Sequence, residues 1–458
     1  DFEQTVADAK AAWNKELNKV KVSTQDAVSK KIFYTSLYHT LFAPSEFCDV
    51  NGDYYGADKQ IHHGKGFKNY TTFSLWDTYR AAQPLMTILQ PERMSDIINT
   101  MLHIYEQQGK LPVWHLMGCE TNCMVGNPGV PVVADAILKD IKGFNSELAF
   151  KALKESSMLP ERGMEYRIQY GFIPADKMTE AIAYDMEYAI ADWAVAQAAR
   201  RLGKQDDYTY FLERSKSYKN YFDASTGFMR GKLSDGSWRT PFSPYASAHR
   251  DDDYCEGNAW QYTWLVPQDV EGLVACFGSK DAFVHKLDSL FLASGDMGEA
   301  SSPDISGLIG QYAHGNEPSH HITYLYTLVG QPWKTAERVK EILHTMYTDQ
   351  PDGLSGNEDV GQMSAWYVFS AMGFYPVNPV SGEYEIGTPL FPEIQMHLDN
   401  GKTFTVLAPG VSRENIYIQS VKVNGQPYDK SYITHRQIMD GATVEFEMGP
   451  EPGNIWYR

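Results

Sequence analysis

The segment TEAIAYDMEYAIADWAVAQAARR, residues 179–201, decides the fold class of this chain. Its apolar side chains recur every three or four residues, which places them on one face of an α-helix. The members of this stripe are Ile182, Met186, Ala189, Ile190 and Trp193. Thr179 stands before the stripe and is a residue type that caps helix N-termini. The segment predicts a long helix in a protein that is mainly α.

The same periodicity recurs, between loops rich in Gly and Pro, through the first 375 or so residues. Further helices are expected at residues 6–20, 28–41, 77–89, 94–106, 206–221, 258–266, 280–292, 320–329, 333–346 and 361–372. Pro84 is expected to kink the helix at 77–89. This succession of helices indicates a toroid of antiparallel helix pairs, with function in the loops at one end.

The pattern changes after Pro376, where short alternating runs are bounded by Gly, Asn and Pro. Strands are expected at residues 385–386, 394–398, 404–408, 416–421 and 443–448. Asn400-Gly401 and Asn424-Gly425 are typical of tight hairpin turns. Residues 376–458 are therefore expected to form a small antiparallel β-module packed on a helical domain of residues 1–375.

Composition excludes several classes of protein. The chain has 458 residues and a net charge of −18, which would repel the phosphates of a nucleic acid. No apolar run reaches the roughly 18 residues that a membrane span needs. The five cysteines include no pair of C-x-x-C knuckles, which argues against a structural zinc site and against a dense disulfide framework.

Two loops carry carboxylates beside aromatic residues. In SLWDTYR, residues 74–80, Asp77 could accept hydrogen bonds from two sugar hydroxyls beside a stacking face of Trp76; an ordinary helix start is the alternative. Glu256 precedes a helix that contains three aromatic residues. Desolvation there would raise the pKa of its carboxyl group and suit a general acid, and a helix-capping role is the alternative.

A third loop, LPVWHLMGCETNCMVGNPG at residues 111–129, is unusually long. Loops of this length are commonly functional. His115, Cys119, Glu120 and Cys123 could be read as a soft-metal site, or a Cys-His pair as a thiol catalyst, but ordinary side-chain hydrogen bonding is the favoured interpretation.

The fourth region consists of residues 314–321 and 352–362. Its Asn, Glu and Asp oxygens suit a hard cation such as calcium, whereas the adjacent His320 and His321 cannot easily share one zinc ion. If the helices close into a ring, Glu256 can meet the Glu358-Asp359 pair. Two such carboxyls are what an inverting glycosidase needs, one to protonate the leaving oxygen and one to activate water.

Four runs in this order resemble glycoside hydrolase family 92, the exo-acting, calcium-dependent, inverting α-mannosidases. The runs are SLWDTYR (74–80), EGNAWQY (256–262), GNEPSHH (315–321) and GNEDVGQMSAWY (356–367). The resemblance covers almost the whole chain. It implies an (α/α)6 barrel, a mannose-containing glycan as substrate and Ca²⁺ as cofactor, bound to the 2- and 3-hydroxyls of the sugar.

The resemblance also implies roles for individual residues. Glu256 matches the general acid and Asp359 the general base, and because position 357 is Asn, Glu358 or Asp352 would have to assist Asp359. The expected calcium ligands are Asn316, Glu317 and Asp359. The expected substrate contacts are Trp76, Asp77, Trp114, Glu120 and His321.

Family members carry an N-terminal β-sandwich before the barrel, whereas this sequence begins at the linker helices. Either the sequence is the C-terminal part of a cleaved or truncated protein, or the sandwich lies elsewhere; it is expected to pack on the barrel. The family implies a secreted or periplasmic location. An inactive mannose- or glycan-binding protein would keep Trp76, Asp77 and Trp114 but would need no acid and no base. A lyase of the same fold would need basic residues for a uronic acid, which the acidic composition disfavours.

Overall fold

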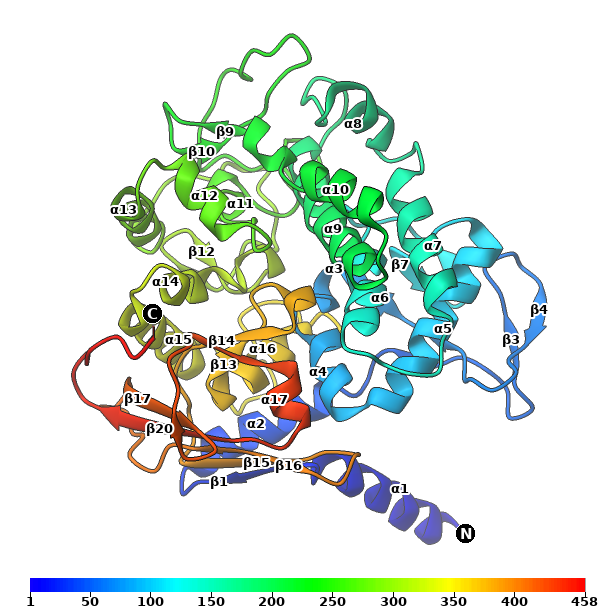
Figure 1. Ribbon diagram of the computed structural model, residues 1–458, viewed down its shortest axis with the longest axis vertical. Coiled ribbons are helices and arrows are strands. Elements are labelled where there is room, and N and C mark those ends of the chain that lie inside the picture. The colour runs from blue at the N-terminus through cyan, green and yellow to red at the C-terminus, as the bar shows by residue number, and fades with distance from the viewer. Residues whose placement is uncertain (458) are drawn as a thin grey trace.

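The computed structural model describes residues 1–457 and is rich in helix, with many short strands (Figure 1). The helices are α1 (Phe2–Leu17), α2 (Ala27–His39), α3 (Leu75–Thr78), α4 (Ala82–Leu89), α5 (Pro91–Gln108), α6 (Gly129–Leu138), α7 (Ser146–Met158), α8 (Met164–Tyr170), α9 (Ala181–Arg201), α10 (Gln205–Arg214), α11 (Ala259–Tyr262), α12 (Val270–Cys276), α13 (Lys280–Leu290), α14 (Leu325–Leu328), α15 (Pro332–Thr345), α16 (Gln362–Met372) and α17 (His435–Met439). The short 3₁₀ helices are η1 (Ser217–Asn220), η2 (Glu317–Ser319), η3 (Ile322–Tyr324) and η4 (Pro379–Ser381).

The strands alternate with these helices and gather near the C-terminus. They are β1 (Val20–Ser23), β2 (Ser45–Glu46), β3 (Asp53–Tyr55), β4 (Ile61–His63), β5 (Tyr70–Thr71), β6 (Phe73–Ser74), β7 (Trp114–Leu116), β8 (Cys119–Glu120), β9 (Phe222–Asp223), β10 (Phe228–Met229), β11 (Leu308–Ile309), β12 (Tyr312–Ala313), β13 (Phe374–Tyr375), β14 (Glu383–Ile386), β15 (Glu393–His397), β16 (Thr403–Leu407), β17 (Tyr417–Val423), β18 (Gln426–Pro427), β19 (Tyr432–Thr434) and β20 (Thr443–Gly449). Within residues 1–457, no helix is both long enough and apolar enough to cross a membrane.

Helix α9 lies in the interior, against α6, α7 and α10, and confirms the helix expected from the apolar stripe. Its start differs from the expectation, because Thr179 does not cap it. Residue 180 precedes the first turn, and the backbone N–H groups of Glu180 and Ile182 donate to the carbonyls of Asp252 and Asp253, at 2.6 and 3.0 Å. Carbonyl groups of a distant loop therefore replace the hydroxyl cap.

Two carboxylates on α9 are fully buried because one arginine of α8 reaches both of them. Arg167 donates from Nε to Asp185 Oδ1 at 2.8 Å and from Nη1 to Asp192 Oδ2. The relative exposure of Asp185 is 0% and that of Asp192 is 1%. Charges this deep require a partner, so Arg167 is what permits Asp185 and Asp192 in the interior of α9.

Replacing Arg167 with Met is expected to lower the free energy of unfolding by about 3–5 kcal/mol, because it leaves two buried carboxylates without their main partner. Urea unfolding followed by circular dichroism measures this change. Arg201→Met is the matched control on the end of α9. Arg201 pairs with Asp140 at 2.7 Å, but both side chains are about half exposed, so a change of about 0–1 kcal/mol is expected. Equal losses in the two variants would contradict the argument.

The helix expected at 77–89 is interrupted, and the interruption serves the site described below. It is divided into α3 and α4, and the N–H groups of Ala81 and Ala82 donate to Gln362 Oε1 at 2.9 and 3.1 Å. Pro84 lies in the first turn of α4 and produces no kink within a longer helix. The helix expected at 320–329 is likewise replaced by the 3₁₀ turn η3 and the short α14.

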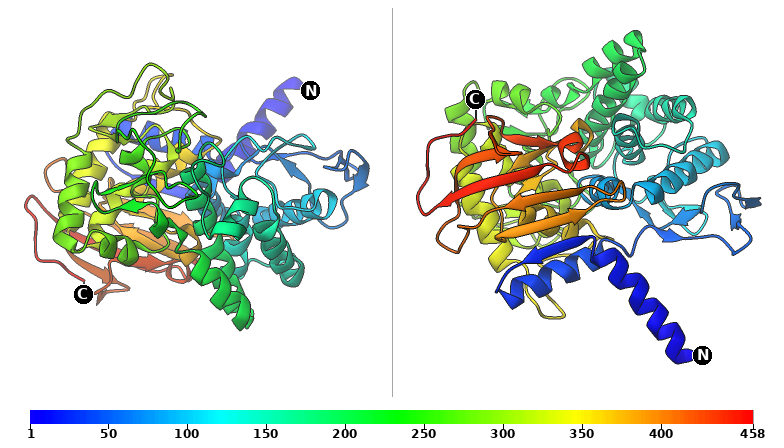
Figure 2. Two further views of the ribbon diagram at one scale, coloured as in Figure 1. Left: turned by 90° about the horizontal axis from the view of Figure 1, so that it is seen from above. Right: turned by 60° about the horizontal axis from the view of Figure 1, so that its bottom comes forward.

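The C-terminal sheet corrects two expectations. It is mixed and not antiparallel, because β16 and β20 pair in parallel in the order β1-β15-β16-β20-β17-β18. Its first strand comes from the opposite end of the chain, where Val20 was expected to end a helix. Val20 pairs with Met396 and Val22 with Ile394, and Figure 2 (right) shows this strand at the sheet edge. The hydrophobic core runs without a break from the helices into this sheet.

Candidate active site

Four segments that the sequence singled out lie directly before a helix start. Ser74 precedes α3, Asn258 precedes α11, Asn316 precedes η2 and Gly361 precedes α16. The structure brings these starts together, so that loops separated by up to about 280 residues share one site. For example, Gln362 at the start of α16 binds the backbone at the start of α4. The candidate side chains therefore come from one end of the helical part.

The loops before η2 and α16 touch through a pair of glycines. A Cβ atom on Gly356 would lie 2.3 Å from the carbonyl oxygen of Gly315, and a Cβ on Gly315 would lie 2.8 Å from that of Ser355. Only residues without a side chain allow this approach. Glu317 follows one glycine by two positions and Asp359 follows the other by three, so the contact places their carboxyl groups together.

Three carboxylates converge at this contact and form what we call the carboxylate trio, Asp77, Glu317 and Asp359. One oxygen from each lies within 4.8 Å of the others. Burial, together with the negative charge of its neighbours, raises the pKa of Asp77 and that of Glu317 well above their ordinary values. Like charges this close cannot all ionise without a cation between them.

The trio suits a hard divalent cation. Neither oxygen of Glu317 accepts a hydrogen bond from any amide, hydroxyl or cationic group of the described residues, although both oxygens are buried. All the metal ligands that the trio offers are carboxylate oxygens, which is the ligand type that calcium prefers over zinc. The residues present therefore fit a calcium ion, with Asp77 as a candidate ligand that the sequence had assigned only to the substrate.

The buried guanidinium group of Arg80 acts on the trio, because its positive charge opposes the rise in the pKa of Asp77 and of Glu317. Arg80 donates from Nη2 to Glu187 Oε1 of α9 at 2.6 Å, and Tyr79 donates to the other oxygen at 2.9 Å. Arg80 also lies over the ring of Trp76, 5.0 Å from its centroid. These contacts hold the backbone between α3 and α4, and with it Asp77, in a fixed position.

Glu256 lies at the edge of the trio, on the loop before α11. The Asn316 side chain donates from Nδ2 to the Glu256 carbonyl at 2.8 Å and to its Oε2 at 3.3 Å. Burial and the charge of Asp304 raise the pKa of Glu256 to about 7. Asn316 thus links the Glu256 loop to the trio, and its Oδ1 is the only side-chain atom that it could offer a cation.

Burial, with the charges of Glu358 and Asp304, raises the pKa of Asp359 to about 6. The charge of Asp359 in turn raises the pKa of Glu256, so the two candidate catalytic groups share one electrostatic environment. Both have a left-handed backbone, with φ of 50° at Glu256 and 52° at Asp359, and the next residue Val360 has φ of 47°. Strain of this kind at non-glycine residues, above all at a β-branched one, concentrates at functional sites.

The residues expected to contact the substrate differ in their burial and in their partners. Trp114 is half-buried on β7, which pairs with β6 so that Trp114 lies opposite Ser74, beside the Asp77 segment. Trp76 has no exposed surface, so in this chain it offers no face to a sugar; the stacking role expected of it is not supported. Its Nε1–H is buried and has no hydrogen-bond partner among residues 1–457.

Two further expected contacts are occupied by backbone. Glu120 accepts N–H groups from Val113 and Trp114, at 2.8 and 2.9 Å, and therefore fixes the 111–129 loop. His321 donates from Nε2 to the carbonyl of Trp264 at 2.7 Å, and burial lowers its pKa to about 4. Both side chains thus have structural partners that the sequence did not reveal.

Glu358 and Asp352, the residues expected to assist Asp359, have other surroundings in the structure. Glu358 accepts the N–H of Gly361 at 2.5 Å and that of Ser364 at 3.4 Å, so it caps α16. Asp352 is exposed. Asp304 is the acidic neighbour that sequence reasoning missed; its charge acts on both Glu256 and Asp359, and Asn357 donates to it at 3.2 Å. The stretch SSPDISG around it carries no recognisable signal.

The chain is similar to known proteins over almost its whole length. Residues 1–450 match the glycosyl hydrolase family 92 catalytic domain. The family GH92 alpha-mannosidase BT3965 from Bacteroides thetaiotaomicron, solved with mannoimidazole, is 43% identical, with a TM-score of 0.96 over 99% of this chain and 60% of that one. The family GH92 inverting mannosidase BT2199 from Bacteroides thetaiotaomicron VPI-5482 is 34% identical, with a TM-score of 0.90 over 99% of this chain and 63% of that one.

A protein of Arthroderma benhamiae described as a secreted glycosidase is 26% identical, over 98% of this chain and 57% of its own length. The chain thus spans 57–63% of the length of these relatives. The motif resemblance, the family match and the two solved relatives all agree. The chain belongs to glycosyl hydrolase family 92, and residues 1–450 correspond to its catalytic domain.

Proposed function

We propose that this chain is the catalytic part of an inverting exo-α-mannosidase, which removes terminal α-linked mannose from mannosides or N-glycans with the help of calcium. The observation that carries the proposal is the meeting of Glu256, with its raised pKa, and an oxygen-only carboxylate trio that contains Asp359. The relatives described as an alpha-mannosidase and as an inverting mannosidase support the same substrate class and outcome.

In this mechanism the two carboxyl groups exchange one proton each with the reactants. Glu256, whose pKa of about 7 keeps much of it protonated at neutral pH, donates its proton to the leaving glycosidic oxygen as the bond to C1 breaks. Asp359, with the lower pKa of about 6, accepts a proton from water as the water oxygen bonds to the opposite face of C1. The products are β-mannose and the free alcohol.

Asp77, Glu317 and Asp359, with Asn316 through its Oδ1, would hold the calcium ion. When bound, calcium would bind sugar hydroxyls and help draw the ring towards an oxocarbenium-like geometry. The chain itself supplies the position. The ion pair between Arg80 and Glu187 fixes the segment that carries Asp77. The contact between Gly315 and Gly356 keeps Glu317 beside Asp359.

The family also supports an (α/α)6 arrangement of the helices, a division near residue 375, an N-terminal β-sandwich packed on the barrel, and a secreted or periplasmic location. These belong to the proposal. The shared core and the β1–β15 pairing support close packing of residues 376–458 on the helical part.

Removal of calcium is expected to inactivate the enzyme reversibly and to lower its melting temperature, because the trio would be left as three unpaired carboxylates. EDTA treatment followed by dialysis, with mannose release and calorimetry as readouts, measures both effects. Calcium should restore activity and melting temperature better than zinc. Restoration by zinc alone would contradict the hard-oxygen ligand set.

The anomer first released tests the function itself. A proton NMR time course on an α-mannoside is expected to show β-mannose before mutarotation produces the α-form. Early α-mannose would exclude inversion. Absence of any hydrolysis, with retained binding of the glycan by the full-length protein, would favour an inactive glycan-binding protein.

A further inference from the structure

A second polar cavity lies away from the carboxylate trio, where α2, α15 and the loop after β16 meet. Its volume is about 310 Å³. Its polar lining consists mainly of Asp26, Ser29, Lys340, His344, Ser412 and Arg413. None of these residues takes part in the site proposed for hydrolysis, so the cavity requires an explanation of its own.

Lys340 is the unusual member of this lining. Its relative exposure is 5%, yet among residues 1–457 no carboxylate lies within ion-pair distance of its ammonium group and no acceptor binds it. Burial lowers its pKa to about 7. A desolvated ammonium group without a partner costs free energy that the fold must offset elsewhere, so an unpaired lysine at this depth indicates a missing partner.

His344 adds a second unpaired group on the same face of α15. It lies one helical turn after Lys340, and residues four apart on a helix are neighbours. Its Nε2 atom is buried and has no hydrogen-bond partner in the part of the chain that the structure describes. Two adjacent polar groups on α15 therefore lack partners at one cavity.

The acidic side chain in the lining forms no ion pair with them, although its charge acts on His344 and on Arg413. Asp26 accepts the N–H groups of Val28 and Ser29, both at 3.1 Å, and the hydroxyl of Ser29 at 2.7 Å, so it is committed to capping α2. Arg413 lies exposed at the rim and forms no ion pair with any carboxylate of residues 1–457. The cavity thus has two cations and one committed carboxylate, in a chain of net charge −18.

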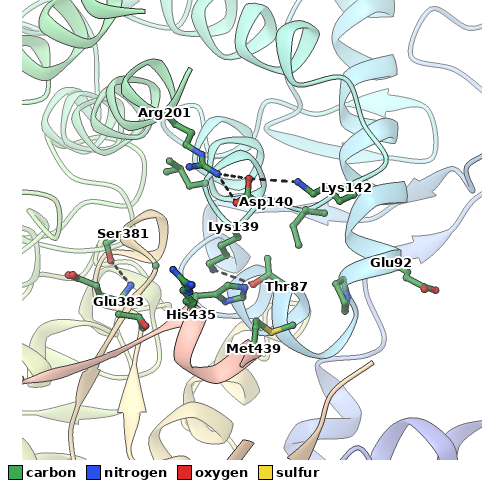
Figure 3. Close-up of a pocket in the computed structure, with 16 residues that line it drawn as sticks. Thr87, Glu92, Lys139, Asp140, Lys142, Arg201, Ser381, Glu383, His435 and Met439 are labelled. Atoms are coloured by element: carbon green, nitrogen blue, oxygen red, sulfur yellow. Dashed lines mark hydrogen bonds and ion pairs between the residues drawn. The ribbon is translucent and has the colours of Figure 1, made fainter. Parts of the chain in front are cut away.

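A larger cavity provides a contrast (Figure 3). It measures about 770 Å³ and is also lined by basic residues. Their charges are matched, however: Lys139 pairs with Asp135 at 2.7 Å, and Arg201 pairs with both oxygens of Asp140. No buried cation there lacks a partner, so size alone does not make it a ligand site.

We propose that the cavity at α2 and α15 binds a small oxyanion, a phosphate or sulfate group, between Lys340, His344 and Arg413. The ammonium and guanidinium groups would donate charge-assisted hydrogen bonds, and His344 would line the cavity beside the ion. The ion could be free or carried by a sugar. Both sources present the same tetrahedral group of oxygens to these side chains.

Isothermal titration calorimetry with inorganic phosphate tests the site, at pH 6.5 and at ionic strength matched with chloride. The wild-type protein should bind one phosphate. Lys340→Met should weaken binding by about tenfold or more, and Arg413→Gln should weaken it less, because Arg413 is at the rim. Inorganic sulfate and glucose 6-phosphate form parallel arms that separate a free ion from a sugar-borne one.

Lys334→Met is the matched control, since Lys334 is on the same helix but pairs with Asp288 outside the cavity, at 2.7 Å. Its phosphate affinity should equal that of the wild type. Lys340→Met removes an unpaired buried charge and should melt at the same or a higher temperature. If Lys340→Met fails to fold, the phosphate affinity of Arg413→Gln tests the proposal instead. No phosphate, sulfate or glucose 6-phosphate binding by the wild type, or wild-type affinity in the folded cavity variants, would overturn the proposal.

Discussion

Replacing Asp359 with Asn is expected to lower kcat/KM by about 10²–10⁴-fold on every α-mannoside, whatever its leaving group. The reason is that water must lose a proton as it attacks C1, and an amide cannot accept that proton. Asn has nearly the same size, and the contact between Gly315 and Gly356 that positions the loop does not involve the side chain. Steady-state kinetics on an aryl mannoside and on a mannobiose give the ratio for good and poor leaving groups.

Asp359 also belongs to the carboxylate trio, so its loss as a base must be separated from loss of metal. Azide provides the separation, because it attacks C1 without giving up a proton. Rescue of Asp359→Asn by azide, with formation of β-mannosyl azide, supports the base role; no rescue together with weaker calcium binding by calorimetry supports a ligand role only. Asp352→Asn, exposed on the same loop, should keep wild-type activity. Full activity of Asp359→Asn would remove this residue from the mechanism.

Replacing Glu256 with Gln is expected to separate substrates by their leaving groups. Turnover of a mannobiose should fall by about 10²–10⁴-fold, because its leaving alkoxide needs a proton. A dinitrophenyl mannoside should lose far less, because its phenolate leaves without protonation. The Asn316 amide also binds the backbone carbonyl of Glu256, at 2.8 Å, so the loop should keep its place in the variant.

The informative quantity is the ratio of the two losses in Glu256→Gln, measured as kcat/KM with both substrates at one pH. Asp251→Asn is the matched control, since Asp251 lies five residues earlier on the same loop and is exposed. It should leave both rates unchanged. An equal loss on the two substrates would indicate that Glu256 holds the site together and does not act as an acid.

The sequence predicts α15 well because its apolar residues lie on a single face. Helix α6 was missed because GVPVVADAIL begins with Gly, contains Pro and directly follows the Gly- and Pro-rich loop at residues 111–129. Strand β1 was missed for a different reason. Four residues with two buried positions, Val20 and Val22, carry too little pattern, and their partner lies at the other end of the chain.

The residues of the candidate site also fall into those that the sequence predicts and those that it does not. The motifs identify Glu256, Glu317 and Asp359 because unusual runs of Gly, Asn and acidic residues surround them. Asp304 lies in a run without such features, and only the packing of distant loops brings its charge to Glu256. The expected roles of Trp76 and Glu120 changed because burial and backbone hydrogen bonds depend on tertiary contacts that spacing does not encode.

The pairing of β1 with β15 affects how the protein is made. Lys21 pairs with Gln395, so 395 − 21 = 374 positions separate the partners. At a synthesis rate of about 5–20 residues per second, β1 leaves the ribosome roughly 20–75 seconds before its partner strand exists. During that interval Val20 and Val22 have no strand to cover them. The sheet edge therefore closes only after β15 has been made, which is a contact of very high sequence separation.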